Sequence, residues 1–151
     1  MICFETDRLI CKSDLCLENG KLVEAEKDNT LDILNIKPTT GEEGGFVFYH
    51  KELSAVLVCH VGITFVRGRF EVTYGVDNEP FRNQGYMTEA LKSLCGWLFD
   101  NTDQDVIWAL PNGECKEASI RVLEKCDFKT ADTVNGLVWY ELRKESNDKD
   151  E

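Results

Sequence analysis

The feature that most constrains this chain is a change in hydrophobic period near its middle. Strand-forming runs of β-branched and aromatic residues come first, at Phe46–His50, Ala55–Val66 and Phe70–Val76. From Tyr86 to Asp100 the apolar residues instead recur at helical spacing. These helical positions are Ala90, Leu91, Leu94, Cys95, Leu98 and Phe99. An antiparallel meander followed by an amphipathic helix predicts a mixed α/β domain.

The second half of the chain continues this alternation. It predicts a strand at Asp105–Leu110, a helix at Glu117–Cys126 and a last strand at Val138–Leu142. The apolar face of that helix is expected to hold Ala118, Val122, Leu123 and Cys126. Strands followed by helix, strand, helix and strand predict a central mixed, mostly antiparallel sheet flanked by helices.

The start of the chain is expected to combine one strand with two helices. Arg8–Lys12 is the expected strand, and Ser13 or Asp14 could cap a helix with Leu15, Leu17 and Leu22 on its apolar face. Further elements are expected as a helix at Asn29–Ile36, a flexible loop at Pro38–Gly45, a bend or bulge at Gly62 and a tight turn at Arg67–Arg69.

Length and charge limit the classes of protein that fit. The 151 residues suit a single domain, expected over residues 1–144 with a charged tail at 145–151. Seventeen basic and 28 acidic residues give a net charge of −11, which argues against a nucleic-acid partner and weakly favours a cationic substrate. No apolar run approaches the roughly 18 residues of a membrane helix, and no secretory signal is visible. The sequence therefore predicts a cytoplasmic protein without a membrane partner.

The cysteines are expected to be reduced and mostly buried. There are seven, an odd number, with no Cys-x-x-Cys pair, and Cys95 and Cys126 lie on the apolar stripes of the expected helices. Neither His50 nor His60 has ligand-like spacing with a cysteine, so no metal site is expected.

The most informative segment for function is the junction between the strand at Phe70–Val76 and the following helix. This junction ends in Arg82-Asn83-Gln84-Gly85-Tyr86-Met87. A glycine at the mouth of a helix lets a ligand approach the backbone closely. The free amides of the first turn, aligned with the helix dipole, then form an anion site suited to a pyrophosphate. Taken alone, a glycine before a helix is usually only a turn.

Three segments together resemble one known family. Arg82–Met87 resembles motif A of the GNAT acetyltransferases, and Tyr74–Val76 with Arg82–Leu91 is similar to the RimJ/RimL-like branch of that superfamily. Glu5–Ile10 resembles the opening of the same branch, and Ala118–Phe128 resembles its motif near the second helix. The resemblance therefore extends along the whole chain in the correct order.

The resemblance implies an N-acetyltransferase that uses acetyl-CoA as its co-substrate. In that family the pantetheine arm lies in a cleft between splayed strands, which here implies contact with the backbone of Tyr74, Gly75 and Val76. The pyrophosphate would rest on the loop and first turn of the helix, at Arg82, Asn83, Gln84, Gly85, Tyr86, Met87 and Thr88. Met87 replaces a small residue of the pattern, so it could narrow this pocket.

The family also implies candidates for the acid and the base. Glu71 stands at the offset before Arg82 at which a related branch carries its general-base glutamate, acting through a water. In many family members the general acid is a tyrosine, but Leu123 occupies that position here. In the RimJ/RimL-like branch a serine is proposed as the general acid, and Ser119 matches it. Glu71 could instead be a solvent-facing strand residue, and Ser119 a small residue that permits close packing. Tyr140 is a weaker acid candidate.

Two positions depart from the family pattern. Lys116 stands where an asparagine usually holds the pantetheine, and nearby Asn112 could substitute for it, while Lys116 could reach a CoA phosphate. Asp127 replaces a glycine, although aspartate tolerates a left-handed helix terminus better than most residues.

The sequence does not identify the acceptor. Protein N-termini, small cationic amines such as polyamines or amino sugars, and antibiotic amines all remain open as substrates. The alternative function is a catalytically silent CoA-binding sensor or interaction module. A homodimer formed through the last strands is also possible.

Overall fold

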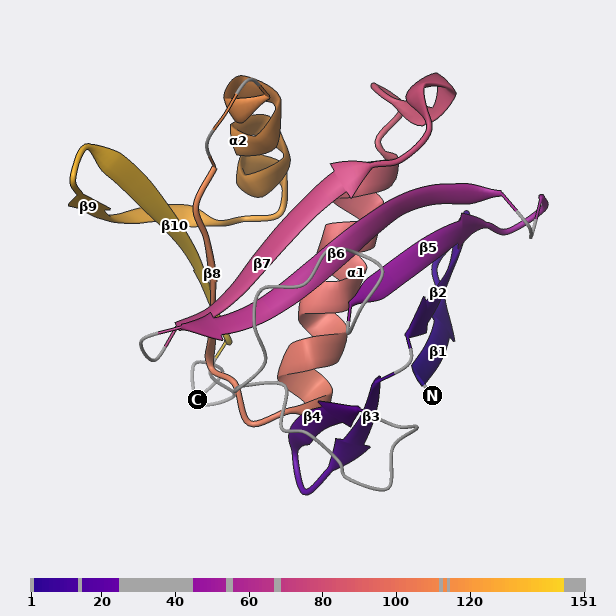
Figure 1. The fold of residues 1–151 in the computed structure, drawn as a ribbon, viewed down its shortest axis with the longest axis horizontal. Helices are drawn as coiled ribbons and strands as arrows, with labels where there is room; N and C mark the ends of the chain where they lie inside the picture. The colour runs from indigo at the N-terminus through magenta and orange to yellow at the C-terminus, as the bar shows by residue number, and fades with distance from the viewer. Residues whose placement is uncertain are drawn as a thin grey trace.

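The computed structural model describes residues 2–13, 15–24, 45–53, 56–66, 69–111, 113 and 115–145. Within these residues an eight-stranded sheet carries two helices, as Figure 1 shows. The sheet order is β1-β2-β5-β6-β7-β8-β10-β9, and the predicted mixed α/β architecture is confirmed. The strands are β1 (Ile2–Glu5), β2 (Leu9–Ser13), β5 (Phe46–His50), β6 (Leu57–Val66), β7 (Arg69–Val76), β8 (Val106–Ala109), β9 (Lys129–Val134) and β10 (Leu137–Arg143). The helices are α1 (Tyr86–Asn101) and α2 (Lys116–Lys125), with a short 3₁₀ helix η2 (Glu79–Phe81) between β7 and α1.

The sheet is antiparallel except where β7 meets β8. These two strands are parallel and share a single register pair, Glu71 opposite Trp108. Parallel neighbours need a crossover connection, and α1 provides it. Beyond the shared pair the strands diverge: in Figure 1, β7 leads up to the loop before α1, and β8 leads up towards α2. The sheet therefore opens between β7 and β8.

The predicted meander of β5, β6 and β7 is confirmed, but the bulge is not at Gly62. Gly62 lies opposite Thr73 within an unbroken β6–β7 register. The irregularity lies between β5 and β6 instead, where Phe48 pairs with Cys59 and the next residue pairs with Leu57. Val58, the extra residue, is completely buried, so the sheet absorbs the insertion without exposing an apolar side chain.

The prediction of a helix after Ser13 is wrong. Leu15–Glu18 (β3) and Lys21–Glu24 (β4) form a two-stranded hairpin, separate from the main sheet. Asn19 and Gly20 join them with φ values of 53° and 79°, the left-handed backbone of a two-residue hairpin turn. Leu15 and Leu22, assigned to one helix face, are indeed both buried, but on the hairpin.

A second Asn-Gly turn also forms a hairpin, near the end of the described residues. Asn135 and Gly136 have φ values of 54° and 80° and connect β9 to β10. The strand β9 was not predicted, because most of its residues are polar and every one of them is exposed. The predicted helix at 29–36, most of the loop at 38–45 and residues 67 and 68 lie outside the described residues.

The helix α1 supplies much of the core. Its buried residues include Ala90, Leu91, Leu94, Cys95 and Leu98, as its spacing predicted, whereas Phe99 is only partly buried. The helix α2 covers the sheet less completely, and Leu123 is its only buried residue. Ala118, expected on its apolar face, is exposed, since the short helix contacts the core through its C-terminal half.

The described cysteines are free thiols, as predicted. Cys11, Cys59, Cys95 and Cys126 are buried, whereas Cys3 and Cys115 are exposed. Burial raises the pKa of Cys59 and of Cys126 to about 12 and also raises that of Cys11 and Cys95. No described helix is long and apolar enough to cross a membrane, and no described cluster of His, Cys, Asp and Glu could hold a metal ion.

Titration of the thiols should distinguish the buried cysteines from the exposed ones. In native protein we expect fast reaction with a disulfide reagent at no more than three of the seven cysteines, because four are buried and resist ionisation. Denaturant should release the remaining four. Fast reaction of five or more thiols in the folded protein would contradict the burial.

Candidate active site

The loop between β7 and α1 presents unpartnered amides. Asn83 has a φ of 62°, and Gly85, directly before α1, has a φ of 81°. No side chain caps the helix at Gly85, and the first helical bond runs from the Glu89 amide to the Gly85 carbonyl. The amides of residues 85–88 consequently have no partner within the helix. Together with the helix dipole they form a site for an anion.

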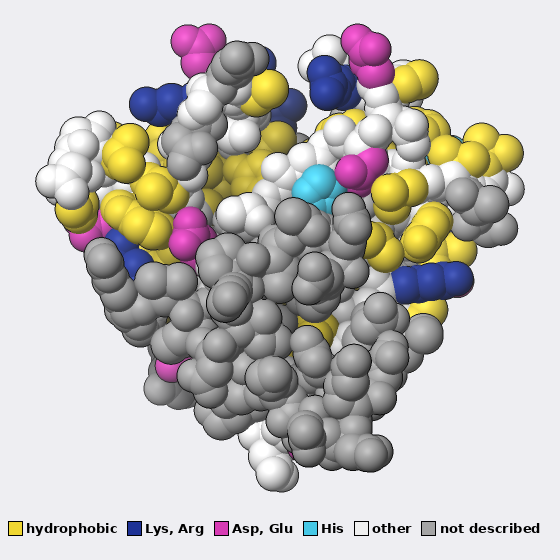
Figure 2. Space-filling view, in the orientation of Figure 1, with side chains coloured by type: hydrophobic (Ala, Val, Ile, Leu, Met, Phe, Trp, Pro, Cys, Tyr) yellow, Lys and Arg dark blue, Asp and Glu magenta, His cyan; other side chains and the backbone are white. Residues whose placement is uncertain are grey.

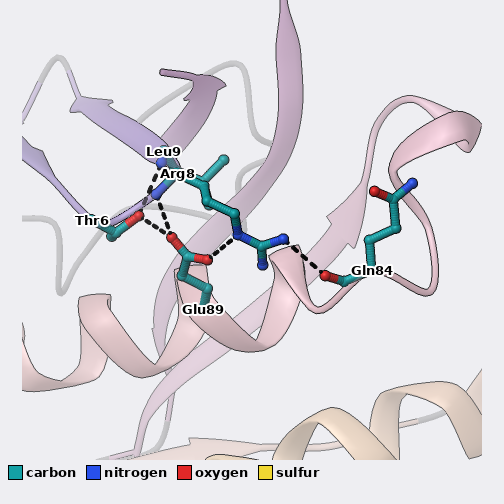
Figure 3. A network of polar contacts seen from close by, with 5 residues as sticks. All are labelled: Thr6, Arg8, Leu9, Gln84 and Glu89. Atoms are coloured by element: carbon teal, nitrogen blue, oxygen red, sulfur yellow. Dashed lines mark hydrogen bonds and ion pairs between the residues drawn. The ribbon is translucent and has the colours of Figure 1, made fainter. Parts of the chain in front are cut away.

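A network around Arg8 fixes this loop, and Figure 3 shows it. The Arg8 Nε donates to Glu89 Oε1 over 2.7 Å, and the Arg8 backbone amide donates to Glu89 Oε2 over 2.9 Å. The Thr6 hydroxyl also donates to Glu89 Oε2. The Arg8 Nη1 donates to the Gln84 carbonyl over 3.1 Å, and its guanidinium lies 4.0 Å from the centre of the Tyr86 ring. The network therefore joins two sequence motifs that lie about 80 residues apart.

Glu89 is ionised because of these donors. Its burial alone would raise the pKa, but the hydrogen bonds from Thr6 and Arg8 outweigh burial and lower the pKa below its usual value. The charge then holds Arg8 in the position from which it contacts the Gln84 carbonyl.

Aromatic rings anchor the same loop on its other side. The Phe81 ring meets Tyr86 edge-on, with the ring centres 5.4 Å apart, and His50 lies 5.8 Å from Phe81. The His50 Nδ1 accepts hydrogen bonds from the amides of Glu52 and Leu53. The loop is thus fastened at its start by packing and at its end by Arg8.

The end of β7 forms the second part of the site. On one side, Tyr74, Gly75 and Val76 pair with β6. On the other side, β7 is paired with β8 only at Glu71, so its later backbone groups border the opening. The Tyr74 hydroxyl donates to the Ser119 carbonyl over 3.0 Å and thereby ties β7 to α2. Burial raises the pKa of Tyr74, so this hydroxyl remains a donor.

Replacing Tyr74 with phenylalanine should cost about 1 kcal/mol in the free energy of unfolding, the net value of one buried hydrogen bond. Urea titration would measure the loss. Tyr140→Phe is a matched control, since Tyr140 packs in the same core and no described residue accepts a hydrogen bond from its hydroxyl. Equal effects of the two changes would contradict the role given to Tyr74.

Glu71 lies where the opening between β7 and β8 begins. Burial raises its pKa, and the nearby positive charge of Arg69 partly opposes that rise. The Arg69 guanidinium lies 4.1 Å from the Trp108 ring centre and 4.7 Å from that of Trp139, and it donates to Asp132 over 2.8 Å. The positive charge of this fixed arginine limits how far burial can raise the pKa of Glu71.

The structure places the other predicted site residues as follows. Lys116 begins α2 and is exposed, whereas Asn112 lies outside the described residues. Met87 is buried in the core, so its side chain does not narrow the loop as expected. Asp127 has a φ of 72°, the left-handed terminus that its substitution for glycine required. Tyr140 is a core residue.

One polar pair near the opening was missed as a functional candidate. His60 Nδ1 lies 3.0 Å from each carboxylate oxygen of Asp77, the residue that follows β7. The sequence showed His60 only as an unsuitable metal ligand. The signal that could have revealed the pair is the β6–β7 register, which places His60 opposite Gly75, two residues before Asp77.

The loop, the helix N-terminus and the opened sheet together define the class of protein: a mixed α/β fold whose sheet opens beside the free amides at the start of a helix. The profile of the acetyltransferase (GNAT) domain matches residues 22–129, and the chain belongs to this family. Among curated proteins, no sequence matches the chain.

Several solved structures share the fold. A GNAT-family acetyltransferase from Bacillus anthracis has 16% identity and a TM-score of 0.65, with 96% of this chain and 100% of that one covered. The ribosomal α-N-protein acetyltransferase RimL, in complex with coenzyme A, has 16% identity and a TM-score of 0.54, with 67% and 62% covered. The aminoglycoside acetyltransferase AAC(6')-Ib, with coenzyme A and kanamycin, has 15% identity and a TM-score of 0.56, with 66% of each covered. The chain spans less than two thirds of the length of some of these proteins.

Proposed function

We propose that this protein is an N-acetyltransferase that transfers the acetyl group of acetyl-CoA to a primary amine. The observation that carries the proposal is the row of unpartnered amides at Gly85–Thr88, next to the opening between β7 and β8. Membership of the GNAT family supports it, as do the coenzyme A complexes of RimL and AAC(6')-Ib. The motifs at Tyr74–Val76 and Arg82–Leu91 support the further proposal that the chain belongs to the RimJ/RimL-like branch.

In this proposal the co-substrate is held by the loop before α1 and by the edge of β7. Its pyrophosphate lies on the amides of residues 83–88, beside the exposed Arg82. Its pantetheine arm lies along the free edge of β7 at Tyr74–Val76, as an added strand would. Lys116, exposed at the start of α2, is proposed to contact a phosphate of the co-substrate.

Transfer requires direct attack of a neutral amine on the thioester carbonyl. Glu71 accepts a proton from the ammonium through a water, and its raised pKa brings it nearer to the pH at which it works. Ser119, partly exposed on α2, supplies a proton to the departing thiolate. The carbonyl of the same serine accepts the Tyr74 hydrogen bond, which fixes the helix turn that carries the hydroxyl.

The acceptor is a cationic primary amine in the cytoplasm. The net charge of −11 attracts such a group, and the solved relatives include one that acts on a protein N-terminus and one bound to an aminoglycoside. A homodimer through the last strands would use β9, which is the edge of the sheet, because β10 already pairs with both β8 and β9.

Calorimetric titration with acetyl-CoA is the decisive first test, followed by a screen of amines for release of free CoA thiol. Binding together with turnover on any amine is the expected result. Binding without turnover across peptide N-termini, polyamines and aminoglycosides would favour the silent CoA-binding module. No binding would reject the proposal.

A further inference from the structure

The face of the sheet opposite α1 and α2 carries a second proton-accepting group. Side chains alternate along β7, and Phe70, Val72 and Tyr74 point to the side of the helices, where the first two are buried in the core and the third contacts Ser119. Glu71, Thr73 and Gly75 therefore point to the opposite face. Figure 2 views the molecule from this side and shows a histidine beside an acidic side chain at the surface.

His60 belongs to this face and is held in one orientation. It pairs with Gly75 across the β6–β7 register, and its Nδ1 contacts both oxygens of Asp77 at 3.0 Å. The Asp77 amide donates to the Val58 carbonyl over 2.8 Å, which fixes the residue that holds the ring. Both side chains are partly exposed, at 29% and 27%, so the pair is ordered yet accessible.

The imidazole of His60 lies over β7 at Gly75. A β-carbon at residue 75 would lie 3.4 Å from His60 Cε1 and 3.8 Å from Nε2. With Nδ1–H donated to the carboxylate, Nε2 is the ring nitrogen that can accept a proton. This nitrogen lies over the middle of Tyr74–Val76, the strip along which the thioester arm is proposed to lie.

Glu71 and His60 occupy different parts of that face. Four residues along β7 correspond to about 13 Å, so Glu71 lies at the start of the opening and His60 beside the proposed thioester arm. An ammonium must lose two protons during acetylation: one before it attacks, and one from the nitrogen after the new bond has formed. Both protons leave the same nitrogen beside the thioester, so the more distant Glu71 takes the first through water and His60, beside the arm, is placed to take the second directly.

We propose that His60, positioned by Asp77, accepts the second proton. The inference rests on the proposed acetyltransferase function. The neutral amine, after its first proton has passed to Glu71 through water, attacks the thioester carbon and forms the C–N bond. The positively charged nitrogen of the tetrahedral intermediate then gives a proton to His60 Nε2. As the C–S bond breaks, the CoA thiolate takes a proton from Ser119, and the imidazolium returns its proton to the serine through solvent.

The charged groups around His60 are few among the described residues. Asp77 contacts it directly, and Lys12 lies in the same cross-strand row, separated from it by Val47. Glu71 lies further along the same face. Asp77 is thus the one described charged group within hydrogen-bonding reach of the ring.

The test uses the full chain and an amine identified by the screen. His60→Ala should lower kcat about 100-fold, with the affinity for acetyl-CoA unchanged in calorimetry. Added imidazole should raise the kcat of His60→Ala at least tenfold, because it can occupy the space left by the missing ring. His60→Gln is the matched control: it fills the same space without a proton acceptor, so imidazole should not restore it.

Asp77→Asn tests the positioning role. It should lower kcat about tenfold, and the double variant with His60→Ala should be no slower than His60→Ala alone, because the two residues act as a unit. Asp100→Asn, an exposed carboxylate at the far end of α1, should leave kcat unchanged.

The outcomes separate the two proposals. If the native protein binds no acetyl-CoA or acetylates no amine, the proposed function fails and this inference fails with it. If the native protein is active and His60→Ala retains more than half of kcat, the inference alone is rejected. A folded His60→Ala variant that imidazole does not restore would also reject it.

Discussion

Glu71→Gln lowers kcat about 100-fold while the affinity for acetyl-CoA changes by less than twofold. Glutamine keeps the shape of the side chain but cannot accept the ammonium proton. The carboxylate lies where β7 and β8 separate, on the face that the helices leave free, so it has no role in holding the CoA loop. Steady-state kinetics combined with calorimetry would measure both quantities.

The pH dependence of the rate is a second test of Glu71 as the base. Burial raises the pKa of Glu71 above its usual 4.5, so the native rate should fall as acid protonates the carboxylate at a pH above 4.5. The glutamine variant should lack this acid limb. Glu124→Gln, an exposed change on α2, is the control and should behave as the native protein does. A Glu71→Gln variant with more than a third of the native kcat would exclude Glu71 as the base.

Glu89→Gln should destabilise the fold by about 2 kcal/mol and also weaken acetyl-CoA binding. Three donors, from Thr6 and Arg8, lose their charged acceptor. We expect no larger loss, because the Arg8 side chain is 41% exposed and water can solvate it. Binding weakens because Arg8, once released, no longer holds the Gln84 carbonyl. Urea titration and calorimetry would measure the two effects.

Acid should remove the difference in unfolding free energy between the native protein and Glu89→Gln. Glu89 has a lowered pKa in the folded state, so its contribution to stability is complete well above pH 4.5 and disappears as the pH falls through the folded-state pKa. The two unfolding free energies should therefore converge only after the pH has fallen below the folded-state pKa of Glu89, which lies under the usual 4.5. Glu5→Gln breaks an exposed pair with Lys51 at 3.4 Å and should change stability by less than about 0.5 kcal/mol. A Glu89→Gln effect as small as that of Glu5→Gln would contradict the importance of the network.

The sequence predicted the second half of the fold better than the first. Between Phe46 and Arg143 the apolar period identified every strand except β9, because each of those elements buries one regular face. The first hairpin was mistaken for a helix because Leu15 and Leu22 also fit helical spacing. The Asn19-Gly20 turn was the better signal, since two successive left-handed residues end any helix.

The loop before α1 was predictable, whereas its supports were not. A glycine ahead of an amphipathic helix is visible in sequence, and its left-handed backbone follows from the need to enter α1. The bond between Arg8 and Glu89 depends on β2 lying beside the start of α1, a tertiary fact that spacing does not contain. The contact between His60 and Asp77 likewise requires the register of β6 against β7.

The single shared pair between β7 and β8 also makes the sheet two units in mechanical terms. One comprises β1, β2, β5, β6 and β7 with α1; the other comprises β8, β10 and β9 with α2. Few backbone hydrogen bonds cross the seam, which is held instead by side chains such as Arg69 and Tyr74. The shared core still joins the two units, but we expect their slowest amides to exchange as two distinct cooperative groups. A ligand lying in the seam bonds to both units and would merge them into one.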